Sequence, residues 1–163
     1  MTSTDTEFVI SRTFDAPRAV VWQAFAEPER LVQWWGPKGF RMETMASRFE
    51  PGGIYHYRMR SEQGNEMWGR FAYREIVPPE RTVFVMSFSD EGGRIVRAPF
   101  GIAFPLEVLT TVAFNEVDGK TELTITGRPL NATEEEREVY RSMHDSMRTG
   151  FGNALDELSR QIS

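Results

Sequence analysis

The chain has 163 residues, of which 40% are hydrophobic and 26% are charged, a composition typical of a globular domain and unlike that of disordered or collagenous chains. It contains no cysteine, which excludes disulfides, cysteine-ligated metals and thiol nucleophiles. Its 19 basic and 24 acidic residues give a net charge of −5, and a negative charge opposes binding to phosphate backbones. We therefore expect one domain over residues 1–163 and no nucleic-acid partner.

The N-terminal residues are polar and acidic through Glu7, without the basic and apolar regions of a secretory signal. No apolar run approaches the ~20 residues that a membrane-spanning helix requires. The sequence therefore predicts a cytoplasmic protein without a membrane span.

The first predicted elements are one strand and two short helices. Residues 7–14 alternate loosely and are rich in Phe, Val, Ile and Thr, which favours a strand. Pro17 and Pro28 each begin a helix, because proline fits the first helical turn. The second of these helices ends at Gly36.

Strand-length runs separated by turn residues occupy the middle of the chain. Glycine pairs and Asp-Gly in the turns are typical of hairpins, so the strands are expected to be antiparallel. The runs cover residues 40–49, 54–60, 67–76, 82–88, 108–114 and 121–126.

The C-terminal region is predicted to form one helix over residues 133–161. Thr133 and Glu136 have the spacing of a capping box, and acidic residues suit the positive end of the helix dipole. Apolar residues then recur at helical spacing and give a stripe that must lie against the sheet. That stripe contains Tyr140, Met143, His144, Met147, Phe151, Ala154, Leu155, Leu158 and Ile162.

Motifs along nearly the whole chain resemble those of one known family. They are Phe14-Asp15-Ala16-Pro17, Trp34-Trp35-Gly36-Pro37-Lys38-Gly39-Phe40, Pro51-Gly52-Gly53, Tyr73-Arg74-Glu75-Ile76-Val77-Pro78-Pro79-Glu80-Arg81 and the stretch 147–158. The resemblance is to bacterial relatives of the heat-shock protein 90 ATPase activator domain. It implies an α+β helix-grip fold of the START and birch-pollen-allergen superfamily (SRPBCC). In that fold a curved seven-stranded antiparallel sheet wraps a long C-terminal helix and often leaves an apolar cavity.

The two histidines do not converge in the predicted fold. His144 shares the helical stripe and could present a polar group to a ligand, although a helix histidine is more often structural. His56 alternates with Tyr55 and Tyr57, so it faces solvent if they face inward. No metal-binding motif, phosphate loop or nucleophile elbow is present. We therefore predict no metal, no cofactor and no catalytic residue.

Apolar and adaptable side chains are the remaining candidates for a binding site. Methionine fills irregular spaces and tolerates varied partners, and helix glycines at 150 and 152 are costly unless space or close approach is needed. A packed core without a ligand would look the same in sequence. The predicted ligand-binding residues are Tyr57, Met59, Phe71, Phe84, Met86, Phe100, Phe104, Met143, His144, Met147 and Phe151.

The connection over residues 97–106 is too apolar for an ordinary solvated loop. Phe100, Ile102 and Phe104 are predicted either to close the mouth of the cavity or to form a homodimer contact, and the two are not exclusive.

The predicted function is binding of a small lipophilic or aromatic molecule between the sheet and the C-terminal helix. Two alternatives come from other classes, since the superfamily also contains lipid binders, polyketide cyclases, hormone receptors and co-chaperone domains. One is a chaperone-interacting module, which dispersed charge disfavours. The other is a cyclase- or hydrolase-like enzyme that uses His144 or a tyrosine as general acid or base.

Overall fold

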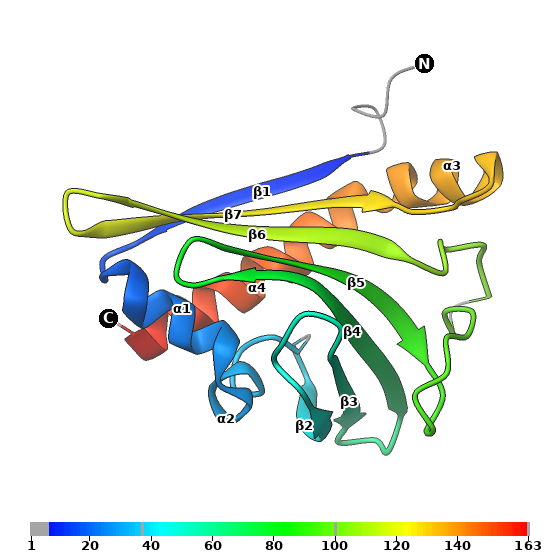
Figure 1. Ribbon diagram of the computed structural model, residues 1–163. Helices are drawn as coiled ribbons and strands as arrows, with labels where there is room; N and C mark the ends of the chain where they lie inside the picture. The colour runs from blue at the N-terminus through cyan, green and yellow to red at the C-terminus, as the bar shows by residue number, and fades with distance from the viewer. Residues whose placement is uncertain (1–6, 37, 100, 163) are drawn as a thin grey trace.

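Seven strands form one curved antiparallel sheet in the order β1-β7-β6-β5-β4-β3-β2 (Figure 1). The computed structural model describes residues 7–36, 38–99 and 101–162. The strands are β1 (Phe8–Phe14), β2 (Phe40–Ser47), β3 (Ile54–Ser61), β4 (Glu66–Val77), β5 (Arg81–Ser89), β6 (Val108–Val117) and β7 (Lys120–Pro129). Each strand from β2 onward pairs with its chain neighbour, and β1 closes the sheet against β7. The predicted strands and their antiparallel pairing are confirmed.

The helices lie against one face of this sheet. They are α1 (Arg18–Ala26), α2 (Pro28–Leu31), α3 (Glu134–Ser142) and α4 (His144–Ile162). Figure 1 shows α4 crossing behind the sheet, with α1 beside its C-terminal end and α3 beside the end of β7. The α+β helix-grip arrangement, with two short helices after the first strand, is confirmed.

The C-terminal helix is divided at Met143, where the sequence predicted one helix over residues 133–161. Met143 ends α3 with φ −92° and ψ −1°, and its N–H is shared among the last carbonyls of that helix. The Met147 N–H then donates to the Met143 carbonyl at 2.8 Å, so the chain keeps a helical course across the break. The capping box is present, because Thr133 Oγ1 accepts from the Glu136 N–H and the Glu136 carboxylate accepts from the Thr133 N–H.

Two apolar clusters fill the space between sheet and helices. The larger one joins α1, the segment after α2 and the C-terminal half of α4, and includes Phe25, Trp34, Leu123, Leu155 and Leu158. The smaller one consists of Phe8, Val108 and Tyr140, near the α3 end of the sheet. The cavity described below borders both clusters.

The outer face of the sheet is covered at His56, which the sequence predicted to face solvent. His56 is only 9% exposed, because the turn after β5 folds over it. Its ring stacks on Trp68 with centroids 5.7 Å apart, and Nε2 lies 3.2 Å from the Asp90 carbonyl oxygen. Gly93, at φ +88°, lies directly above the ring. Alternation in β3 therefore predicts correctly that His56 lies on the outer face of the sheet. The turn after β5 covers this part of the face and shields the ring from solvent.

Candidate functional site

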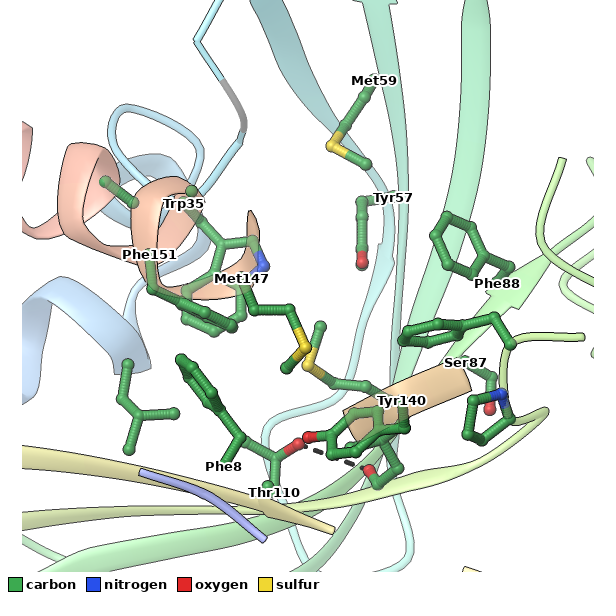
Figure 2. A pocket seen from close by; sticks show the side chains of 18 residues that line it. Phe8, Trp35, Tyr57, Met59, Ser87, Phe88, Thr110, Tyr140, Met147 and Phe151 are labelled. Carbon is green, nitrogen blue, oxygen red and sulfur yellow. Dashed lines mark hydrogen bonds between the residues drawn. The ribbon is translucent and has the colours of Figure 1, made fainter. Parts of the chain in front are cut away.

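A cavity of about 250 Å³ lies between the sheet and the helices α3 and α4 (Figure 2). None of the described side chains that line it is charged. The volume is just below the range of roughly 300 to 1,000 Å³ that is common for ligand pockets. It exceeds the roughly 150 Å³ that accommodates benzene in an apolar protein interior. The space therefore fits a molecule of one or two rings.

Six predicted site residues line the cavity. Tyr57 and Met59 come from β3, Met86 from β5, and Met147 and Phe151 from α4. Phe104, from the loop between β5 and β6, is the sixth. Strand alternation and helical spacing bring these side chains together, since each element presents one apolar face to the interior.

Phe71 and Phe84 lie outside the lining of the cavity. Both are 1% exposed and stack on each other with ring centroids 4.4 Å apart. The indole of Trp35 packs edge-on against Phe71 at 5.4 Å and forms the wall instead. The two phenylalanines are core residues behind that wall.

Met143 and His144, at the junction between α3 and α4, also lie outside the lining. The His144 ring packs against Phe8 and Tyr140, with centroid distances of 5.6 and 5.3 Å. Phe8 and Tyr140 line the cavity in its place. Phe100 falls outside the described residues, and Ile102 is half-buried but does not line the cavity.

Trp35 is the lining residue that sequence reasoning missed most clearly. Its neighbour Trp34 is 2% exposed and donates its indole N–H to the Ala24 carbonyl at 3.0 Å. Trp35 instead faces the cavity and packs edge-on against Phe151 at 5.6 Å. The paired tryptophans marked the family resemblance, but nothing in their spacing separates a structural indole from one that lines a cavity.

Two strand glycines make room for tyrosine hydroxyls beside the cavity. A Cβ at Gly69 would lie 2.4 Å from the Tyr57 hydroxyl oxygen, and a Cβ at Gly127 would lie 2.5 Å from that of Tyr140. Burial raises the pKa of both tyrosines, so their hydroxyls stay protonated. Glycine at each position is therefore required by close approach.

Only one of the two helix glycines borders the cavity. Gly150 lines it, and a Cβ there would meet nothing within 4 Å. Gly152 instead lies beside Arg12, whose Nη2 is 3.5 Å from its carbonyl oxygen. The expectation that a helix glycine leaves open space therefore holds for Gly150 but not for Gly152.

The loop before β6 is fastened to the start of α3. Arg97 Nη1 donates to the Phe104 carbonyl at 2.8 Å and to the Glu136 carboxylate at 2.6 Å. The hydrogen bond from Arg97, and next the one from the Thr133 N–H, lower the pKa of Glu136. The Phe104 ring then lies 5.8 Å from that of Tyr140. These contacts hold Phe104 at the cavity wall.

Among the described residues, no group of three His, Asp or Glu side chains could hold a metal ion. No described helix is both long and apolar enough to cross a membrane.

The family described as "Activator of Hsp90 ATPase homolog 1-like protein" matches residues 15–162. The chain belongs to this family. A comparison with curated proteins found no match.

Solved structures of bacterial proteins share the fold. One from Mycobacterium smegmatis is 23% identical, with a TM-score of 0.81, over 99% of this chain and 93% of its own. A protein from Arthrobacter aurescens is 24% identical, with a TM-score of 0.79, over 98% and 87%. The AHSA1 protein from Silicibacter pomeroyi is 17% identical, with a TM-score of 0.72, over 95% and 96%. At these identities the likeness establishes the fold alone.

Proposed function

We propose that the protein binds a small, uncharged, lipophilic molecule in the cavity between the sheet and α4. The observation that carries the proposal is an internal space of about 250 Å³ whose described lining holds no charged side chain. Such a space favours apolar ligands, because desolvating them is favourable whereas an ion would lose its hydration without a compensating partner.

The composition of the walls supports the same function. Met59, Met86 and Met147 all line the cavity, and their flexible thioethers can repack around ligands of different shape. Gly150 and the half-buried Phe104 lie at its boundary. We propose that the loop carrying Phe104 closes the entrance, while a homodimer contact through the same loop stays a prediction. A cytoplasmic location also stays a prediction from the sequence.

Ligand binding is tested with a substitution that fills the cavity. Naphthalene is expected to raise the melting temperature of the wild-type protein, because a ligand that binds only the folded state stabilises it. Met147→Trp is expected to remove that increase while circular dichroism shows a folded protein. Met45→Trp is the matched control, since Met45 is 38% exposed on β2 and does not line the cavity. An unchanged increase in Met147→Trp would contradict the proposal.

The family description favours a second candidate, a module that stimulates a chaperone ATPase. Turnover of a bacterial heat-shock protein 90 homologue, measured with and without this protein, tests it. Several-fold stimulation that is lost on mutation of an exposed patch would make this the leading function. An enzymatic role through His144 has less support, because His144 packs against Phe8 and Tyr140 rather than lining the cavity. The alternative of a tyrosine as general acid or base stays a prediction from the sequence.

A further inference from the structure

Two hydrogen-bonding groups face the cavity, and within residues 7–36, 38–99 and 101–162 neither has a hydrogen-bond partner. They are the indole Nε1–H of Trp35 and the hydroxyl of Tyr57. The two residues are 8% and 4% exposed. Figure 2 shows the indole nitrogen and the phenolic oxygen turned into the same space from different walls. The other polar side chains of the lining differ, because the Thr110 hydroxyl donates to the Val108 carbonyl and the hydroxyls of Ser87 and Tyr140 are fully buried.

Neither atom is among the buried polar atoms without a partner in the described part of the chain, since both face the cavity. A few polar groups that fix a ligand's orientation are typical of an otherwise apolar pocket. Groups of the same two kinds elsewhere in the chain can be paired within the protein. The Trp34 indole donates to the Ala24 carbonyl at 3.0 Å, and the Tyr55 hydroxyl lies 2.8 Å from Thr44 Oγ1. The two open groups in the cavity therefore indicate a ligand that supplies the missing partner.

The chemistry of the two groups defines that partner. An indole N–H can only donate, and a protonated phenol can donate as well. Burial raises the pKa of Tyr57, so its proton is retained at neutral pH. One acceptor oxygen with two lone pairs can serve both donors. No charged side chain lines the described cavity, so a carboxylate or phosphate would be buried without a counter-ion.

We propose that Trp35 and Tyr57 together donate hydrogen bonds to the oxygen of a neutral carbonyl compound, such as an aryl ketone, aldehyde, ester or quinone. This assignment rests on the proposed function and specifies the ligand class for the same cavity.

Both donors are held in place before a ligand arrives. The Trp35 indole packs against Phe71 and Phe151 at centroid distances of 5.4 and 5.6 Å. The Tyr57 ring crosses Gly69 so closely that a Cβ there would lie 2.5 Å from its Cζ. Preorganised groups lose little freedom on binding, which favours affinity.

Tyr55 provides a matched comparison. It lies on the same strand as Tyr57 and its ring stacks on that of Tyr57, but it does not line the cavity. Its hydroxyl lies 2.8 Å from Thr44 Oγ1. We therefore expect removal of this hydroxyl to leave carbonyl recognition unchanged.

The experiment compares two probes of nearly equal shape, 2-acetylnaphthalene and 2-isopropenylnaphthalene, by calorimetric titration. The carbonyl compound is expected to bind about tenfold more tightly, the effect of one to two net hydrogen bonds. Tyr57→Phe is expected to reduce this preference by about fivefold without weakening binding of the hydrocarbon, whereas Tyr55→Phe keeps the preference. 2-Naphthoate is expected to bind more weakly than the ketone.

The outcomes separate this inference from the proposed function. If neither neutral probe binds, cavity binding itself fails. If both bind equally, if naphthoate binds most tightly, or if Tyr57→Phe keeps the preference, cavity binding stands and the assignment to Trp35 and Tyr57 is overturned.

A second measurement tests Trp35 without altering its packing. In nitrogen-15 spectra, 2-acetylnaphthalene is expected to shift the indole proton of Trp35 downfield relative to the hydrocarbon. The Trp34 indole, already bonded to Ala24, should not differ between the two probes. Equal shifts of the Trp35 proton with both probes would contradict a hydrogen bond from this residue.

Discussion

The two halves of α4 lie over interiors of opposite character. In the C-terminal half, Leu155 and Leu158 are 0% and 1% exposed and belong to the larger core cluster with Phe25 and Trp34. In the N-terminal half, Met147 and Phe151 are only half-buried and border the cavity. One apolar stripe thus borders a packed core at one end and the cavity at the other.

The difference comes from what the rest of the chain supplies. At the packed end, α1 and the segment after α2 insert aromatic rings, with Phe25 only 4.7 Å from Trp34 and 5.4 Å from Phe114 between ring centroids. At the cavity end, the covering element is the loop that carries Phe104, and Gly150 contributes no side chain. Helix periodicity identifies the buried face of α4. Packing from segments distant in the chain decides whether that face lies in a filled core or borders a cavity.

The largest expected effect compares truncations at the two ends. Leu155→Ala is expected to lower the free energy of unfolding by about 3 kcal/mol, because it leaves a void in a close-packed cluster. Met147→Ala is expected to cost about 1 kcal/mol, since it enlarges a space that already exists and its side chain is half-buried. Urea unfolding of both variants measures the difference. Equal losses would mean that the two ends are packed alike.

Gly127→Ala tests the close approach beside the cavity. Its Cβ would lie 2.5 Å from the Tyr140 hydroxyl oxygen, whereas the Tyr140 Cζ is 3.9 Å away. The substitution is expected to cost about 2 kcal/mol as overpacking, and most of that cost should disappear in the background Tyr140→Phe.

Gly69→Ala, combined with Tyr57→Phe, is the matched control for the double-mutant cycle of Gly127→Ala and Tyr140→Phe. A Cβ at Gly69 would meet the Tyr57 Cζ at 2.5 Å as well as its hydroxyl, so Tyr57→Phe should not relieve the cost. Thermal unfolding of the single and double variants gives both coupling energies. Equal relief at the two glycines would contradict the described geometry.

A smaller effect is expected at the fastening of the loop to α3. Because the pKa of Glu136 is lowered in the folded state, its stabilisation is present above its ordinary pKa of 4.5 and is lost as pH falls through the lowered folded value. Glu136→Gln keeps an acceptor for the capping box but removes the charge facing Arg97. We expect a loss below about 1 kcal/mol, because Arg97 is partly exposed.

The measurement is the difference in melting temperature between wild type and Glu136→Gln, determined near pH 7 and near pH 3. The difference is expected to shrink at the lower pH. A difference that does not change with pH would show that the charge on Glu136 does not stabilise the fold.

The sequence predicts the fold well because its signals are local. Turn residues separate the strands, and the Thr133 and Glu136 pair marks the start of the terminal helix. The break at Met143 could not be predicted, because the apolar stripe continues through it. The covering of His56 also depends on a turn that is distant in the chain.

The cavity is only partly predictable for a related reason. Alternation in β3 correctly turns Tyr57 and Met59 inward, but Phe71 and Phe84 obey the same rule and lie behind Trp35. Trp35 contributes to the cavity wall from an irregular segment, in which no helical or strand periodicity predicts where a side chain points. The sequence therefore identifies the inward faces, and only the tertiary structure divides them into core and cavity.

The most direct test of ligand binding in the cavity uses carbon-13 methyl labels on the eight methionines. Met59, Met86 and Met147 line the cavity, whereas the described Met42, Met45, Met67 and Met143 do not. With 2-acetylnaphthalene bound, intermolecular nuclear Overhauser effects are expected from the ligand to the methyl groups of Met59, Met86 and Met147. Effects confined to Met45 or Met67, or no effects at saturating ligand, would contradict binding in the cavity.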